Sequence, residues 1–149
     1  MILLDVNVLI YAHRVQYVEH AVAAPFLQGL LDAEDRFGVP EMVLHAFVRV
    51  VTQKFHTPPT PLDQALEFCD TLRSSPNCVV VQPGERHWQV FSSICRRTGV
   101  VGGDITDAYL AAFAIERDDE WVTGDQDFAR FPGLRWRNLL DGKVRVNPR

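Results

Sequence analysis

Aspartates stand at three separate junctions of this chain, and their placement is the feature most suggestive of chemistry. Asp5 follows the apolar run ILL, Asp107 opens the segment DAYLAAFAIE, and Asp125 follows WVT in the segment TGDQDF. Each one alone is explained equally well as a helix cap or as an acid in a first helical turn. Three independent junctions that each use Asp, where Ser, Thr or Asn would cap as well, indicate a shared task.

Carboxylates that converge on one point repel one another unless a cation neutralises them. An all-oxygen donor set without neighbouring His or Cys suits Mg²⁺, with Mn²⁺ as the softer alternative, and makes zinc a poor fit. Mg²⁺ held by a few carboxylates keeps several waters and usually completes its ligands from a substrate phosphate. The aspartates therefore indicate phosphoryl chemistry, in which water attacks a phosphodiester.

Alternating strand and helix patterns supply the frame that must position these residues. Strands are predicted at 2–5, 37–39, 78–82, 121–123 and 135–140, and helices at 8–14, 22–33, 41–55, 65–75, 87–98 and 107–118, with Asn7 as the cap of the first helix. Strands separated by helices predict an α/β fold with a parallel central sheet and helices on both faces. Ligands of such sheets collect at the carboxyl ends of the strands.

Length and composition set the outer limits. The 149 residues, 47% of them hydrophobic and 23% charged, predict one domain over 1–149 with a C-terminal tail after about residue 140. A net charge of −4 repels polyanions, so any nucleic-acid contact must be local. Three cysteines without a CxxC pair, and no apolar run of membrane-spanning length, predict a cytoplasmic protein without a disulfide framework.

Three segments in order, DVNVLIYAH, TDAYLAAFAIE and TGDQDFARFPGLRWRNLL, resemble the PIN-domain ribonuclease toxins called VapC, of VapBC toxin–antitoxin systems. The segment EMVLHAFVRVVT resembles the third helix of one branch of these toxins, and the likeness runs from Met1 to about Leu140. It implies a PIN-like fold and a Mg²⁺-dependent endoribonuclease that leaves 5′-phosphate and 3′-hydroxyl ends. It also implies a homodimer, a structured RNA substrate such as tRNA or rRNA, and a VapB antitoxin whose C-terminal segment blocks the site.

The acids of the family carry over onto this chain with one gap. The resemblance assigns metal binding to Asp5, Asp107 and Asp125, and makes Asp127 the accompanying acid. Asp104 has no firm counterpart, and capping is the alternative explanation for its presence.

The gap lies in the third helix, where many members of the family carry a Glu and this chain has Ala46. Glu41 is the nearest substitute, although five residues rotate it by about 140° and shift it by about 7.5 Å on a helix. Glu41 is therefore either a further catalytic acid at the helix start or a first-turn acid favoured by the helix dipole.

Polar and basic residues around these acids complete the prediction. Asn7 and Thr123 flank Asp5 and Asp125 and are candidates to orient them by hydrogen bonds, with helix cap and strand-end hydroxyl as the simpler roles. No histidine is assigned as a general base. The basic residues available for RNA are Arg14, Arg49, Lys54, Arg96, Arg97, Arg130, Arg135 and Arg137, for each of which a solvated surface position is the simpler explanation.

Two other functions compete with the nuclease. A phosphatase of the haloacid-dehalogenase type also begins with a strand ending in Asp, but it needs a second Asp where this chain has Asn7. A non-catalytic PIN module that binds RNA or an antitoxin without cutting is the stronger rival, because Ala46 removes one of the family's acids.

Overall fold

The computed structural model describes the whole chain, residues 1–149, around one six-stranded sheet of order β3-β2-β1-β4-β5-β6. The first five strands pair in parallel and β6 pairs antiparallel with β5. This arrangement confirms the predicted α/β class. The strands are β1 Ile2–Leu4, β2 Phe37–Pro40, β3 Cys78–Val81, β4 Glu120–Thr123, β5 Arg135–Asn138 and β6 Val144–Val146.

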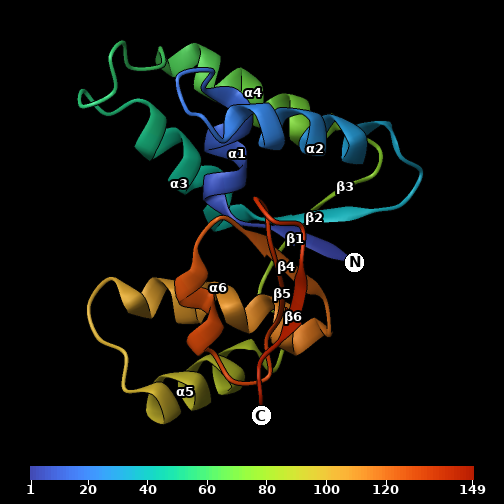
Figure 1. Cartoon of the computed structure of the whole chain (residues 1–149), viewed down its shortest axis with the longest axis vertical. Coiled ribbons are helices and arrows are strands. Elements are labelled where there is room, and N and C mark those ends of the chain that lie inside the picture. Colours follow the sequence, from blue (N-terminus) through green and yellow to red (C-terminus); the bar gives the residue numbers. More distant parts are fainter.

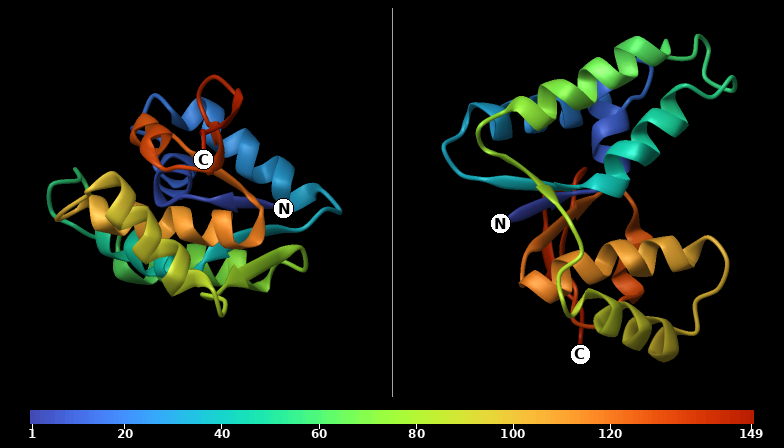
Figure 2. Two further views of the ribbon diagram at one scale, coloured as in Figure 1. Left: turned by 90° about the horizontal axis from the view of Figure 1, so that it is seen from below. Right: turned by 180° about the vertical axis from the view of Figure 1, so that it is seen from behind.

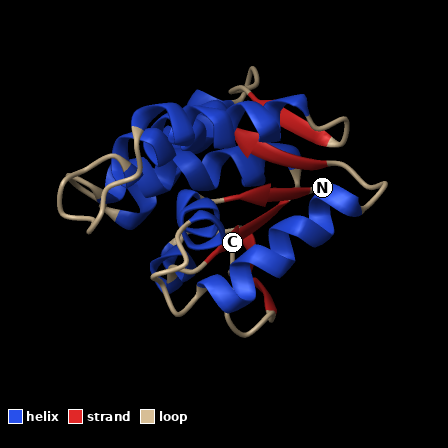
Figure 3. Ribbon diagram, turned by 90° about the horizontal axis from the view of Figure 1, so that it is seen from above, coloured by secondary structure: helices blue, strands red, loops and turns tan.

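Helices cover both faces of the sheet, as Figure 1 shows: α1 to α4 gather on one side of the strands, and α5 and α6 on the other. The view from behind in Figure 2 shows the same division, and Figure 3 shows the strands, in red, with helices around them. Right-handed crossovers produce this division, because the chain moves from β1 to β3 in one direction and then returns to β4. The helices are α1 Val6–His13, α2 His20–Asp32, α3 Glu41–Val51, α4 Leu62–Ser74, α5 His87–Thr98, α6 Asp104–Arg117 and the short 3-10 helix η1 Gln126–Arg130.

The central strands are apolar because helices bury them on both faces. Leu3 and Leu4 of β1 and Trp121 and Val122 of β4 are completely buried, which is the pattern of a parallel strand rather than an alternating one. Helix α6 lies between this sheet and α5, and alanines make up most of its buried residues, so both neighbours can approach it closely.

The direction of strand order reverses between β1 and β4, which are neighbours in the sheet but 118 residues apart at Ile2 and Glu120. Crossovers leave this point in opposite directions, so a crevice opens at the carboxyl ends of the two strands. Asp5 follows β1 directly and Asp125 lies two residues beyond β4. The topology therefore brings two of the predicted acids to the position where such folds bind ligands.

The structure corrects two local predictions. Asn7 does not cap the first helix; the helix begins at Val6, because the Asp5 carboxylate accepts a hydrogen bond from the Val6 backbone N–H. The predicted tail after residue 140 includes β6, which extends the sheet. The buried Asn147 holds this end of the chain in place.

Two further findings concern the cysteines and the lengths of the helices. All three cysteines are unpaired. None of the helices combines the length and the apolarity that a bilayer crossing requires.

Candidate functional site

Three aspartates from three different elements line one cavity of about 200 Å³ at the carboxyl edge of the sheet. Asp5 precedes α1, Asp107 lies in the first turn of α6, and Asp125 caps η1. Ala46 and Arg49 of α3 line the same cavity. The structure thus brings together the three residues that the sequence assigns to metal binding.

Asp5 is held at the floor of this cavity by three hydrogen bonds. Its Oδ1 accepts from the Val6 backbone N–H at 2.7 Å, and its Oδ2 accepts from the Thr123 hydroxyl at 2.6 Å and from the Asn7 amide at 3.1 Å. An ionised carboxylate has about four acceptor positions, so Asp5 retains capacity for one more ligand. Its orientation is set before any ligand arrives.

The same network reaches the Asp125 side of the cavity. The Thr123 hydroxyl also accepts the Asp125 backbone N–H at 3.0 Å, and the Asn7 carbonyl oxygen accepts the Gly124 backbone N–H at 2.8 Å. A Cβ at Gly124 would lie only 3.2 Å from the Tyr11 ring, so glycine permits this close approach. Asn7 and Thr123 therefore connect the start of α1 to the end of β4 and make the hydrogen bonds expected of orienting residues.

Burial dominates the protonation of the acid at the floor. The pKa of Asp5 is raised from 3.8 to about 7, and burial is the largest cause. The charges of Asp107 and Asp125 act in the same direction, and the hydrogen bonds from Thr123 and Val6 act against it. The three carboxylates are thus close enough to disfavour one another's ionised forms, which is the electrostatic condition that a cation would relieve.

Arg130 supplies a positive charge to this acidic cavity from within the chain. Its guanidinium donates to Asp104 at 2.9 Å and to Asp107 at 3.3 Å, which joins η1 to the first turn of α6. Burial raises the pKa of Asp107, as does the charge of Asp125, while Arg130 opposes both. Asp104, left without a metal role by the sequence, is therefore a partner of Arg130 rather than a cap.

The two other acids on the predicted list lie outside the cavity. Asp127 is exposed in η1, where its backbone N–H donates to Asp125. Glu41 lines a separate cavity of about 300 Å³, accepts a hydrogen bond from Gln82 and pairs with Arg73 at 3.5 Å. The structure does not bring Glu41 together with the three aspartates.

Ala46 shows why the missing acid of the third helix is significant. Its side chain lines the aspartate cavity, so a carboxylate at position 46 would have faced Asp5, Asp107 and Asp125. Here the position contributes only a methyl group. The chain therefore departs from the family pattern inside the site itself.

The donor atoms are of the type that a hard cation prefers, because all three cavity aspartates offer carboxylate oxygens and no His or Cys lines the cavity. As the side chains stand, no three of the acidic, His and Cys residues are close enough together to hold a metal ion. Asp107 is engaged by Arg130 instead. A metal at this site would take Asp107 over from that guanidinium.

The basic residues expected at the surface divide into paired and unpaired groups. Arg135 and Arg137 both pair with the buried Glu120. Arg49 is exposed, lines the aspartate cavity and takes part in none of the eight ion pairs. Arg14 is only 5% exposed, so the expectation of a surface residue is wrong for it.

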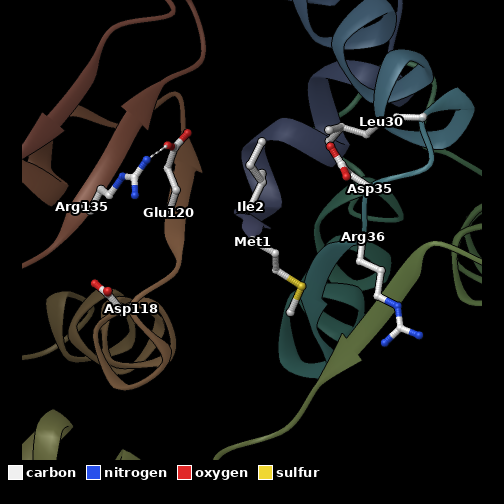
Figure 4. A pocket seen from close by; sticks show the side chains of 9 residues that line it. Met1, Ile2, Leu30, Asp35, Arg36, Asp118, Glu120 and Arg135 are labelled. Carbon is white, nitrogen blue, oxygen red and sulfur yellow. Dashed lines mark ion pairs between the residues drawn. The ribbon is translucent and has the colours of Figure 1, made fainter.

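A wider cavity of about 530 Å³ lies at the opposite edge of the sheet, where the strands begin. Met1, Ile2, Glu120 and Arg135 line it, and Figure 4 shows the Arg135 guanidinium directed at the Glu120 carboxylate. The Nη2 of Arg135 lies 3.3 Å from Glu120, so these charges neutralise each other. In the aspartate cavity, Asp5 and Asp125 take part in none of the eight ion pairs.

Comparison with known proteins places this geometry in a family. The family model for the PIN domain matches residues 2–134. Ribonuclease VapC43 of Mycobacterium tuberculosis is 42% identical over 147 residues, which cover 98% of this chain and all of the relative. The chain therefore belongs to the PIN-domain family and, within it, to the VapC ribonucleases.

Solved structures support the fold independently. The VapBC2 complex of Rickettsia felis, bound to a promoter DNA fragment, contains a chain that matches with a TM-score of 0.67 at 19% identity; the match covers 92% of this chain and 98% of that one. VapC20 of Mycobacterium tuberculosis, described as a sarcin-ricin loop cleaving toxin, matches with a TM-score of 0.65 at 13% identity and covers 88% and 96%. At these identities the likeness establishes the PIN fold.

Proposed function

We propose that this protein is a Mg²⁺-dependent endoribonuclease toxin that hydrolyses RNA phosphodiesters to 5′-phosphate and 3′-hydroxyl ends. The single observation that carries the proposal is the meeting of Asp5, Asp107 and Asp125 in one cavity at the switch point of the sheet. Membership of the VapC ribonucleases supports the same reaction.

The residues of the chain would divide the work as follows. Asp5, Asp107 and Asp125 would hold the cation, which supplies water activation and neutralises charge on the phosphate when it is bound. Asn7 and Thr123 keep Asp5 in the orientation that the cation needs.

One further residue belongs to the proposed site, and two of the predicted acids do not. Arg49, exposed beside the acids, would contact the substrate phosphate. Asp127 and Glu41 lie outside the cavity, so we leave both out of the metal set.

The partners in this proposal follow from the family. The relatives include complexes named VapBC, and we infer a VapB-type antitoxin that covers the cavity, together with a homodimeric toxin and a cytoplasmic location. VapC20 is described as cleaving the sarcin-ricin loop, and we infer a structured RNA, rRNA or tRNA, as substrate here.

A non-catalytic module that binds RNA or an antitoxin is the second candidate. Two observations favour it: Ala46 adds no carboxylate to the cavity, and Arg130 already engages Asp107. Such a protein would bind the cation, or RNA, and leave the RNA intact.

The test is incubation of total RNA with purified, antitoxin-free protein in Mg²⁺, Mn²⁺ or EDTA. Asp107→Asn should abolish discrete 5′-phosphate fragments, because the cavity loses one of its three carboxylates. Asp32→Asn, an equal change in an exposed residue at the end of α2, should cut as the unmodified protein does. Intact RNA under every metal, from folded protein shown to bind Mn²⁺, would reject the nuclease in favour of the binding module.

A further inference from the structure

A cationic pocket, separate from the acidic aspartate cavity, lies at the far end of α1. Arg14 and His56 form its floor and are 5% and 6% exposed, while exposed Gln16, Phe55 and Thr57 surround them in a pocket of about 330 Å³. Figure 1 shows the loop after α1 close to the loop between α3 and α4 that carries His56. The two loops touch through Tyr17 and His56, whose ring centroids are 6.1 Å apart.

The charge on this floor has no counter-ion. The Arg14 guanidinium donates to the Thr60 hydroxyl at 3.1 Å and to the Pro58 carbonyl at 2.9 Å, but it takes part in none of the eight ion pairs. Its Nε and the Nε2 of His56 are both buried without a hydrogen-bond partner. Buried charges and polar groups are normally paired, and the Arg14 guanidinium is a buried cation with a free donor. Burial and the charge of Arg14 lower the pKa of His56, so the positive charge of the floor comes from Arg14, and His56 adds an unpaired ring nitrogen.

An exposed aromatic ring stands beside this cationic floor. Phe55 is 68% exposed, and its ring centroid lies 4.2 Å from that of His56. A cation for the backbone and an aromatic face for the base are the two parts from which single-stranded nucleic-acid sites are built. A nucleotide carries an anion and a flat ring within one unit, whereas an acidic peptide needs two different side chains to use both features, so the combination favours a nucleotide.

The position of the pocket agrees with this assignment. Helix α1 spans eight residues between Asp5 and Arg14, so the pocket lies about 12 Å from the aspartates along its axis. Arg49 lines the aspartate cavity on α3, which packs beside α1.

We propose that the pocket formed by Arg14, His56 and Phe55 binds one nucleotide of the RNA substrate, with its phosphate on the Arg14 and His56 floor and its base stacked on Phe55. This inference rests on the proposed function, because it takes RNA as the ligand. It gives an acidic protein a local anchor for a polyanion, separate from the residues that would cut it.

The first experiment measures binding of fluorescent single-stranded RNA in EDTA over a series of salt concentrations. Phe55→Ala should weaken binding roughly tenfold, the effect of losing one stacked base, and leave the salt dependence unchanged. Arg14→Gln should weaken binding and reduce the slope of log K against log salt by about 0.7, the share of one phosphate contact on a single strand.

Two matched variants control for position. Trp88→Ala removes an equally exposed aromatic ring, 70% exposed on α5, and Arg36→Gln removes a positive charge at the opposite edge of the sheet. Both should bind RNA as the unmodified protein does. Equal weakening by Trp88→Ala and Phe55→Ala, or an unchanged slope in folded Arg14→Gln, would overturn the proposal. If Arg14→Gln disturbs the loop that Arg14 supports, the Phe55→Ala variant still tests the proposal.

The second measurement follows the ring-nitrogen NMR signals of His56 in the unmodified protein. RNA should shift them, which supports the pocket. Shifts caused by inorganic phosphate or by an acidic peptide, without any caused by RNA, would overturn the assignment to RNA. Because both experiments omit metal, a protein that cuts nothing would still report on the pocket, and failure of the nuclease is thereby distinguished from failure of this site.

Discussion

Asp5 combines two roles that other residues could fill only separately. Its Oδ1 caps α1 through the Val6 N–H, while its Oδ2 lies in the hydrogen-bond network with Thr123 at the floor of the cavity. Either role alone would accept Asn. Burial raises its pKa to about 7, and a bound cation would favour the charged form again.

This pKa makes the metal-free protein sensitive to pH. The folded state keeps a proton on Asp5 between about pH 4 and pH 7, where the unfolded state has lost it, so the free energy of unfolding falls as the pH rises through this range. We expect the Asp5→Asn variant, which keeps the helix cap, to lack this decrease in the free energy of unfolding, which is on the order of a few kcal/mol. Urea unfolding in EDTA between pH 4 and pH 8 measures it.

Burial also raises the pKa of Asp107, so the stability of the Asp5→Asn variant should still depend on pH to some extent. Asp32→Asn serves as the control, because its carboxylate is exposed and outside the cavity. Curves of equal slope for Asp5→Asn and for the unmodified protein would contradict the assignment.

At the scale of elements, the contact between η1 and α6 controls the charge of the site. Arg130 extends from the end of η1 to Asp104 and Asp107 in the first turn of α6, and its Nε is buried without a partner. Neutralising two acids in this way stabilises the metal-free protein. The same charge repels an incoming cation.

Arg130→Gln should therefore strengthen cation binding while it weakens the metal-free fold. We expect about a tenfold gain in Mn²⁺ affinity by electron paramagnetic resonance, equivalent to about 1.4 kcal/mol of removed repulsion, and a lower melting temperature in EDTA. Arg145→Gln, which breaks the exposed pair with Asp141 outside the aspartate cavity, should leave the Mn²⁺ affinity unchanged. Weaker Mn²⁺ binding by Arg130→Gln would show that the guanidinium supports the cation instead.

For the whole molecule, the C-terminal segment ties the end of the sheet to η1. Asn147 is buried and donates from its amide to the carbonyls of Phe128 and Phe131, and its Oδ1 accepts from the Trp136 indole at 3.0 Å. Phe128 belongs to the η1 helix that also carries Arg130. The segment after residue 140 therefore supports the active-site side of the fold.

Asn147→Ala should cost about 2 to 4 kcal/mol of unfolding free energy, because it leaves buried polar groups without partners. Val146→Ala, in the neighbouring residue that is 70% exposed, should change it by less than about 0.5 kcal/mol. Chemical denaturation of the three proteins measures the difference. Equal stabilities would show that the C-terminal segment does not support the fold.

The alternation of strands and helices, and the aspartates at strand ends and helix starts, could be predicted from the amino-acid sequence. Both are local properties: periodicity follows from which faces are buried, and a residue after a parallel strand lies at the carboxyl edge of the sheet. The meeting of Asp5 with Asp125 could be predicted for the same reason, since Asp5 ends β1 and Asp125 follows β4.

The contacts of individual side chains depend on the folded arrangement and could not be predicted in this way. Arg130 reaches acids 23 and 26 residues away, Arg14 is covered by a loop 44 to 46 residues later, and Ala46 rather than Glu41 faces the cavity. These outcomes depend on the relative rotation and packing of whole helices, which the spacing along one helix does not specify. The direction and burial of a charge are set by neighbours that become neighbours only when the chain is folded.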